Sequence, residues 1–302
     1  MCEKACSAER LLLAVDGGGT KAEFVLFTAD GHIRKRFCLP GTNVAVYGFE
    51  QVVQTLLEGI ALCAGEQGRL TDLFIGTAGS RLEDLQEALS AQYPELHITV
   101  ESDGMNALHL EEAEAALICG TGSILILKEG DGIRRVGGWG YRMGDPGSGY
   151  NFGHKLLQLC AEHEDGICDH QQLFEAVCKK LQRTTIRGVL RDLEPPQVAA
   201  LAPILLDAYG ADADVPVIVL REMEQLGKMI HATCSPGSRV ILCGGMFRHY
   251  ARLLLPLLQG CTKAEITYLL PDLPPINGAC VRCCRLAGIS CPTEQLKKET
   301  KI

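Results

Sequence analysis

The first hundred residues alternate between short, strongly apolar runs and stretches with helical spacing. Three strands are predicted one after another, two apolar runs at residues 11–16 and 23–28 and a more polar stretch at 32–39 that follows a turn at Ala29-Asp30-Gly31. The runs are followed by a predicted helix (48–66), strand (72–78), helix (82–92) and strand (97–102). A strand meander that continues as alternating helices and strands is typical of an α/β domain with a mixed sheet.

The second half of the chain opens in the same way and then becomes mostly helical. Strands are predicted at residues 115–120 and 123–128, before a turn at 130–132, and again at 239–245 and 265–270. Helices are predicted over residues 150–163, 170–181, 197–209, 215–233, from 246 onward, and over about 277–288. The charged tail LKKETKI (296–302) is predicted to fray.

The openings of the two halves match without a gap at an offset of 101 residues. Gly19-Thr20 corresponds to Gly120-Thr121, and the Asp30-Gly31 turn corresponds to Asp131-Gly132. Any two hairpins can share an Asp-Gly turn, but the Gly-Thr pair at the same distance before it favours a duplicated domain. Asp16 corresponds to Leu117, so only the first copy carries a carboxylate at this place.

Composition narrows the class of protein. The 302 residues carry 29 Lys and Arg against 37 Asp and Glu, a net charge of −8, without a basic stripe, so nucleic-acid binding is not expected. No apolar run approaches the roughly 20 residues of a membrane helix, and the short run at 11–15 is no signal-peptide core. We therefore expect no membrane partner and a cytoplasmic location. The 15 cysteines, several inside apolar stretches, are expected to be reduced thiols.

Two glycine-rich loops between apolar strands are candidates for phosphate binding. The candidate residues are Gly17, Gly18, Gly19, Thr20 and Lys21 in the first loop and Gly120, Thr121, Gly122 and Ser123 in the second. Backbone N–H groups in such turns can point at an anion, and Asp16 is placed to hold Mg²⁺, through water. Either loop alone is equally well explained as a tight turn. Their pairing by the repeat favours two loops that hold one polyphosphate between them.

Two further positions stand where a strand ends and a helix begins. Gly244 and Gly245 leave room for an adenosine against the backbone, although close packing in a turn explains them as well. Asp103 follows the strand 97–102, where ligands bind in α/β sheets, and its carboxylate is a candidate general base for a substrate hydroxyl. The position alone fits a helix N-cap equally well.

The stretch GGWGYRMGDPGSGYNFG (137–153) contains the one tryptophan of the chain in a glycine-rich setting. Trp139 is a candidate to pack against a sugar, and Asp145 to accept hydrogen bonds from its hydroxyls. A tryptophan that anchors a long surface loop is the simpler alternative. Asn43 offers a donor and an acceptor to sugar hydroxyls, or merely a polar turn after Pro40.

Together these motifs resemble the BadF/BadG/BcrA/BcrD ATPase family, and within it the N-acetylglucosamine kinase branch. The resemblance extends over about residues 11–288 and implies duplicated actin-like (ribonuclease H-like) α/β domains with mixed sheets and an inter-domain cleft. We expect a small N-terminal domain of residues 1–104 plus about 287–302, and a large C-terminal domain of residues 105–286. The resemblance also implies that Asp103 is the base for the sugar 6-hydroxyl, that Gly138 contacts the sugar with Asn43, Trp139 and Asp145, and that Gly244 and Gly245 face adenosine.

The predicted function is ATP-dependent phosphorylation of an amino sugar, with N-acetylglucosamine favoured, Mg²⁺ as cofactor and a homodimer as the assembly suggested by the superfamily. An N-acetylmuramic acid or glucosamine kinase of the same fold is the nearest alternative, and a sugar-sensing binder is another. A third is an ATPase that activates a radical dehydratase or reductase through an iron–sulfur cluster, to which Cys280-x-x-Cys283-Cys284 would contribute. Zinc is not expected, because residues 137–180 contain no clustered Cys/His motif and His154, His163 and His170 are interpreted as solvated.

Overall fold

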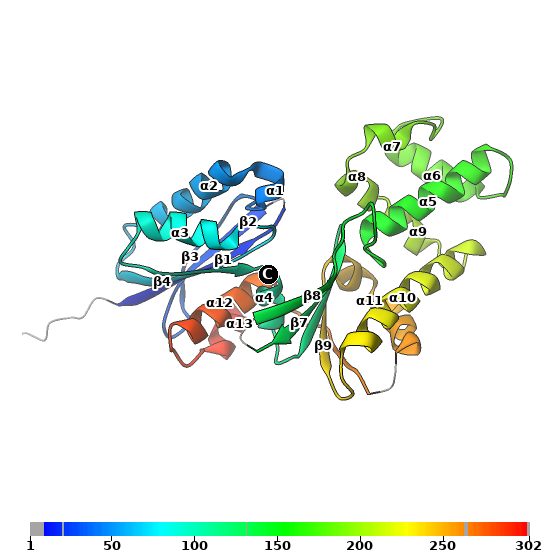
Figure 1. Cartoon of the computed structure of the whole chain (residues 1–302). Coiled ribbons are helices and arrows are strands. Elements are labelled where there is room, and N and C mark those ends of the chain that lie inside the picture. The colour runs from blue at the N-terminus through cyan, green and yellow to red at the C-terminus, as the bar shows by residue number, and fades with distance from the viewer. Residues whose placement is uncertain (1–8, 20, 131, 263–264, 301–302) are drawn as a thin grey trace, which may run out of the picture. The chain divides into compact units, whose positions relative to one another are not determined.

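The computed structural model (Figure 1) describes residues 9–19, 21–130, 132–262 and 265–300. The chain forms two compact units, one of residues 1–112 and 271–302 and the other of residues 113–270. The predicted boundaries lay at 104/105 and 286/287. Residues 105–112 and 271–286 fall in the first unit instead, because helix α12 (Pro275–Leu286) packs on strand β1 (Arg10–Gly17) and on helix α4 (Gly104–Leu108).

The first unit contains a five-stranded mixed sheet. Its strands are β1, β2 (Lys21–Thr28), β3 (Ile33–Pro40), β4 (Arg69–Thr77) and β5 (His97–Ser102), in the order β3-β2-β1-β4-β5. The meander β1–β3 is antiparallel, and β1, β4 and β5 are parallel. Asp16 pairs with Gly76, which pairs with Glu101, so the carboxyl ends of the three parallel strands lie at one edge.

Helices cover both faces of this sheet (Figure 1). On one face lie α1 (Val44–Tyr47), α2 (Phe49–Ala61) and α3 (Leu82–Gln92), and on the other lie α4, α12 and α13 (Thr293–Thr300). Alternate residues of β1 face the two layers: Leu11, Leu13 and Val15 join the core with α2 and α3. Because both faces of the sheet are covered, the central strands β1 and β2 have nearly continuous apolar sequences.

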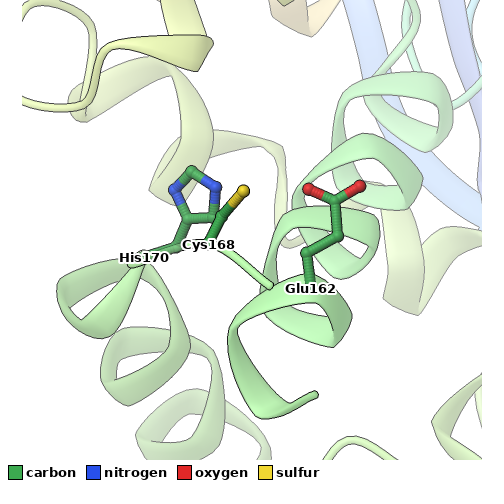
Figure 2. A group of neighbouring side chains, drawn as sticks. All are labelled: Glu162, Cys168 and His170. Carbon is green, nitrogen blue, oxygen red and sulfur yellow. The ribbon is translucent and has the colours of Figure 1, made fainter. Parts of the chain in front are cut away.

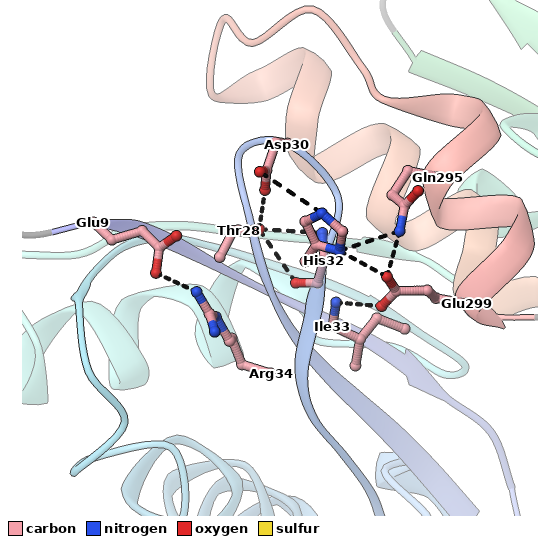
Figure 3. A network of polar contacts seen from close by, with 8 residues as sticks. All are labelled: Glu9, Thr28, Asp30, His32, Ile33, Arg34, Gln295 and Glu299. Atoms are coloured by element: carbon pink, nitrogen blue, oxygen red, sulfur yellow. Dashed lines mark hydrogen bonds and ion pairs between the residues drawn. The ribbon is translucent and has the colours of Figure 1, made fainter.

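The C-terminal tail is ordered, so the prediction that it frays is wrong for the part of the tail that the structure describes. Leu296 and Thr300 lie four residues apart on one side of α13 and are fully buried, and the Asn277 amide donates to the Thr300 hydroxyl over 2.9 Å. Figure 3 shows Glu299 of the same helix, whose carboxylate accepts a 2.6 Å hydrogen bond from the Ile33 backbone N–H and lies beside His32. The helix was not predicted because most of its residues are charged or polar and only one side of it is buried.

The second unit repeats the strand order of the first. Its strands are β6 (Ala115–Cys119), β7 (Ser123–Glu129), β8 (Gly132–Gly137), β9 (Arg239–Cys243) and β10 (Thr267–Leu269), in the order β8-β7-β6-β9-β10. The meander is again antiparallel, and β6, β9 and β10 are again parallel. Because both sheets follow one order, the duplication that the sequence predicted is present in the fold.

Most of the second unit is helical. The helices are α5 (Gly149–Glu164), α6 (Gln171–Leu181), α7 (Val189–Asp192), α8 (Pro195–Ala199), α9 (Ala202–Asp207), α10 (Asp214–Thr233) and α11 (Gly245–Cys261). The single helix predicted over residues 197–209 is two helices, because Pro203 has no N–H to donate to Ala199 and the chain breaks between them. Among the described residues, none of the helices has the length and apolar character needed to cross a membrane.

Candidate functional site

The loop between β1 and β2 is a closely packed glycine turn. The Gly18 N–H donates to the Lys21 carbonyl over 2.9 Å, and the Gly18 carbonyl accepts from the Thr42 N–H over 3.1 Å. A methyl group on Gly17 would collide with the hydroxyls of Thr42 and Thr77. Gly17 is therefore required by packing, whatever the loop binds, whereas a Cβ on Gly19 would meet no atom within 4 Å. Lys21 at the start of β2 is exposed. Thr20 lies outside the described residues.

Asp16 of β1 lies level with Gly76 of β4 and Glu101 of β5 across the sheet, one residue before the glycine turn. The Asn106 side-chain amide donates to Asp16 Oδ1 over 2.6 Å. Burial raises the pKa of Asp16 from 3.8 to about 6, the Asn106 hydrogen bond opposes the rise, and the negative charges of Asp103 and Glu23 add to it. The site thus concentrates negative charge around a carboxylate that burial already destabilises.

Asp103 lies directly after β5, at the same edge of the sheet. Its backbone N–H donates to the Thr77 carbonyl over 3.1 Å, which ties it to the end of β4. Asp103 occupies the N-cap position of α4, but its side chain makes no capping bond to that helix and instead accepts a 3.2 Å hydrogen bond from Ser102 Oγ. The carboxylate of Asp103 therefore does not cap α4, which was the alternative role that the sequence left open.

Asn43 follows β3 and caps helix α1. Its side-chain oxygen accepts the Ala45 N–H over 2.9 Å, as expected of a polar turn residue. A Cβ on Gly79 would lie 2.9 Å from that same oxygen, and Gly79 has a positive φ of 112°. Asn43 is therefore held against the loop that follows β4, at the carboxyl end of the parallel strands.

In the second unit, the loop Gly120–Ser123 connects β6 to β7 and is tied to the glycine-rich segment. The Gly120 carbonyl accepts the Gly149 N–H over 2.8 Å, and the Thr121 carbonyl accepts the Tyr150 N–H over 3.0 Å. Ser123 Oγ donates to the Pro146 carbonyl over 2.7 Å. The second candidate phosphate loop and the segment predicted to contact sugar therefore form one local structure.

Asp145 organises that structure. It has a positive φ of 63° and is 6% exposed, and its Oδ1 accepts the Gly140 N–H over 3.1 Å. A Cβ on Gly122 would lie 2.6 Å from Asp145 Oδ2, so the carboxylate lies against the second phosphate loop. Burial raises the pKa of Asp145, and backbone hydrogen bonds from Gly140 and Ser123 oppose the rise.

Trp139 is 75% exposed and Met143 is 80% exposed, so the simpler alternative, a tryptophan that anchors its loop by burial, does not describe this structure. Gly138 has a positive φ of 66°, and a side chain there would press on Ile124. An exposed indole on a loop held by a buried carboxylate is free to pack against a ligand.

Gly244 and Gly245 follow β9 at the start of α11. Gly244 has a φ of 90°, and a methyl group on it would collide with the Cys119 carbonyl at the end of β6. Nothing lies within 4 Å of the corresponding point on Gly245. Gly244 is thus required by packing, while Gly245 leaves open space. The contact with Cys119 places this turn beside the end of β6, where the Gly120–Ser123 loop begins.

The residues that support the candidate carboxylates were not predicted from the sequence. Asn106 is fully buried and binds Asp16, and a Cβ on Gly76 would occupy its position. Glu222, on α10, is 5% exposed and accepts the Gly147 N–H over 3.0 Å, which fixes the glycine-rich loop from behind. The position of Asn106, three residues after Asp103, was the one available signal.

Comparison with known proteins identifies relatives along most of the chain. The profile of the BadF/BadG/BcrA/BcrD ATPase family matches residues 13–254. An N-acetyl-D-glucosamine kinase from Dictyostelium discoideum is 26% identical over 240 residues, which are 70% of this chain and 75% of that protein. A glucosamine kinase from Vibrio cholerae is 29% identical over 175 residues, 55% of this chain and 59% of the relative.

A solved structure shows the same fold. It is a Chromobacterium violaceum protein provisionally assigned as an N-acetylglucosamine kinase, which superposes with a TM-score of 0.70 at 23% identity. The superposition covers 90% of this chain and 98% of that one. The predicted fold class, duplicated actin-like α/β domains with mixed sheets, is confirmed.

Proposed function

Because this chain belongs to the BadF/BadG/BcrA/BcrD ATPase family, we propose that it transfers the γ-phosphoryl group of ATP to O6 of N-acetylglucosamine. One observation carries the proposal: Asp16 and Asp103 stand at the carboxyl ends of parallel strands in one sheet, close enough for the charge of Asp103 to raise the pKa of Asp16. Two carboxylates at that edge provide one group for a metal and one for a proton. The Dictyostelium relative supports the choice of sugar.

In this proposal, the residues of the predicted loops have the following roles. Phosphate contacts fall to Gly17, Gly18, Gly19, Thr20 and Lys21 in the first unit and to Gly120, Thr121, Gly122 and Ser123 in the second, adenosine contacts to Gly244 and Gly245, and sugar contacts to Asn43, Asp103, Gly138, Trp139 and Asp145. The side-chain NH₂ of Asn43 can donate to a sugar hydroxyl, because its side-chain oxygen already accepts the Ala45 N–H at the N-cap of α1. Buried Asp145 acts on the sugar only if a hydroxyl replaces one of its present partners.

The residues around Asp16 fit a magnesium ion. The negative charges of Asp103 and Glu23 both act on the Asp16 carboxylate, although Glu23 also pairs with Arg36 over 2.6 Å. The Asn106 side-chain oxygen is buried without a hydrogen-bond partner among the described atoms. Oxygen ligands and negative charge are what Mg²⁺ requires. Asp16 would hold the ion, which when bound supplies charge neutralisation to the phosphates of ATP.

Asp103 performs the proton transfer in this proposal. Its carboxylate accepts the proton of the sugar 6-hydroxyl while that oxygen forms a bond to the γ-phosphorus and the bond to ADP breaks. Ser102 Oγ donates a hydrogen bond to Asp103 Oδ1, and this bond orients the carboxylate. The remaining acceleration comes from holding the two substrates in line.

Glucosamine at the same site is the second candidate, and the Vibrio relative favours it. The two sugars differ at C2, where N-acetylglucosamine carries a neutral amide and glucosamine a cationic amine. Comparing kcat/KM for both sugars with one enzyme preparation decides between them. A preference for glucosamine would keep the phosphotransfer mechanism and replace the substrate.

The test of the mechanism is Asp103→Asn. We expect turnover to fall about a hundredfold to ten-thousandfold, the usual contribution of a positioned base, while the affinity for ATP stays within about twofold. The matched control is Asp84→Asn, an exposed aspartate on α3 in the same unit, which should turn over like the natural enzyme. Turnover of Asp103→Asn equal to that of the control would remove Asp103 from the mechanism.

A further inference from the structure

His170, at the N-cap of α6 in the second unit, is not the solvated residue that the sequence predicted. Its side chain is 4% exposed, and its Nδ1 lies 2.7 Å from Asp212 Oδ2. The prediction was wrong because the chain between α9 and α10 folds over the start of α6 and covers the imidazole with Asp212. A buried histidine that binds a carboxylate through one nitrogen has its tautomer and its ring orientation fixed.

The other nitrogen of His170 has no hydrogen bond. Nε2 is buried and without a hydrogen-bond partner among the described atoms, and its nearest ion-pair partner, Asp214 Oδ2, lies 3.5 Å away. With Nδ1–H donated to Asp212, Nε2 carries a lone pair. An imidazole held by a carboxylate on one side, with a lone pair on the other, is the arrangement of metal-ligating histidines in proteins.

Two further donors lie on the open side of the ring. The carboxylate of Glu162, the thiol of Cys168 and a ring nitrogen of His170 all lie within 4.8 Å of one another. Figure 2 shows the three side chains facing a common space, Glu162 from the end of α5 and the other two from the segment that leads into α6. The set contains one nitrogen, one sulfur and one oxygen donor.

The backbone holds this group together without help from a ligand. The Glu162 carbonyl accepts the Ile167 N–H over 2.8 Å and the Cys168 N–H over 3.4 Å, which closes the turn after α5. Gly166 makes the turn possible with a φ of 74°. The His170 N–H donates to His163 Nδ1 over 3.2 Å, so the cysteine and the histidine are both fixed relative to α5.

We propose that His170 Nε2, Cys168 Sγ and the Glu162 carboxylate form a binding site for Zn²⁺. Mixed nitrogen, sulfur and oxygen donors suit this borderline-soft ion, whose four-coordinate sites commonly combine histidine, cysteine and carboxylate ligands. Asp214 or a water molecule completes the coordination, and Asp212 supports the histidine from behind. Cys168 binds as a thiolate and releases its proton to solvent. The ion joins α5, α6 and the start of α10 (Asp214–Thr233), and none of its ligands belongs to the proposed nucleotide or sugar contacts.

A salt bridge is the competing interpretation of the same group. In that case a protonated His170 bridges Asp212 and Asp214, and neither Cys168 nor Glu162 has a role. The two interpretations differ in what the thiol does. The thiol is exposed, so replacing it does not disturb the core.

The test measures metal content and not activity, so it does not depend on the proposed kinase reaction. The full chain is stripped with a chelator, titrated with Zn²⁺ alone, freed of excess metal by gel filtration, and analysed for zinc per chain. We expect about one zinc per chain. Cys168→Ser and Glu162→Gln should each bind Zn²⁺ at least tenfold more weakly, and Cys38→Ser, another exposed thiol, should bind normally.

Co²⁺ gives an independent readout of the sulfur ligand. The natural protein and Cys38→Ser should show a thiolate-to-cobalt charge-transfer band, and Cys168→Ser should lack it. Far-UV circular dichroism establishes that each variant is folded. Absence of stoichiometric zinc, or equal zinc binding and equal cobalt spectra in Cys168→Ser and Cys38→Ser, would overturn the proposal.

Discussion

Asp16 is held at the end of β1 at a cost to the stability of the protein. Burial is the largest cause of the rise of its pKa from 3.8 to about 6, and the charges of Asp103 and Glu23 increase it. A carboxylate whose folded pKa is raised costs the folded state stability as the pH rises from its unfolded pKa to its folded pKa, and the loss is complete above the folded pKa. Such a cost is expected where a charge serves binding and not folding.

Replacing Asp16 with asparagine should therefore stabilise the metal-free protein. Each pKa unit corresponds to about 1.4 kcal/mol, so the gain in free energy of unfolding above pH 6 is up to about 3 kcal/mol. The stability of the natural protein is highest relative to the variant below pH 4 and declines as the pH rises through 6, so the gain should vanish near pH 4. Urea unfolding in a chelating buffer at pH 4, 6 and 8 measures it. A variant that is less stable than the natural protein at pH 8 would contradict the burial argument.

At this scale the sequence predicted the residues that follow strands and missed those that support them. Asp16 and Asp103 were identified because an apolar run shows where a strand ends, and ligands bind at that edge. Asn106 was missed because its contact with Asp16 depends on the packing of α4 under β4, and Gly76 gave no sign that it makes room for an amide. A local pattern does not contain a contact between residues 90 positions apart.

Among the elements, α13 shows how a short amphipathic stripe can escape detection. Only Leu296 and Thr300 are buried in it, and the charged residues around them dominate the sequence pattern. The helix nevertheless makes three hydrogen bonds to two other elements. Thr300 accepts from Asn277 of α12, Glu299 accepts from Ile33 of β3, and the Thr300 carbonyl accepts from Arg36 of β3 over 3.4 Å.

Deleting residues 293–302 should lower the free energy of unfolding by about 3 kcal/mol or more. The deletion removes a buried leucine, worth about 1.5–3 kcal/mol, and leaves the buried Asn277 amide without its partner. Deleting residues 301–302 alone is the matched control and should change little. Thermal unfolding of the three proteins measures the difference, and equal midpoints for both deletions would show that α13 contributes nothing.

The strands were predicted more accurately than the helices. Every predicted strand is present, because a sheet buried on both faces gives continuous apolar runs. The helix predicted over 197–209 failed at Pro203, which periodicity alone tolerates, and α1 was too short to register. Helix length separates the outcomes: the long helices were predicted, and the shorter helices α1, α4, α7 and α13 were not.

The whole molecule consists of two units with separate cores, and only the second is continuous in sequence. The repeat predicted the duplicated strand order, since equivalent loops imply equivalent sheets. It did not predict the boundary, because nothing in the sequence of α12 shows which sheet it covers. Its buried residues, Cys280, Cys283 and Cys284 among them, pack in the first unit.

Fragments should therefore behave differently. Residues 113–270 should fold alone with a cooperative thermal transition, because their strands, helices and core are complete. Residues 1–112 should not, because one face of their sheet loses α12, and joining residues 271–302 to them through a flexible linker should restore the transition. Circular dichroism on the three fragments tests this, and cooperative folding of residues 1–112 alone would show that α12 is dispensable.

The most direct test of the account is ADP release from Mg²⁺-ATP with N-acetylglucosamine, N-acetylmuramic acid, glucosamine, glucose or no sugar. We predict release at least tenfold faster with N-acetylglucosamine than without sugar, and one sugar phosphate formed per ADP. Slow ADP release that is indifferent to every sugar would contradict the kinase assignment and favour an ATPase that activates another enzyme.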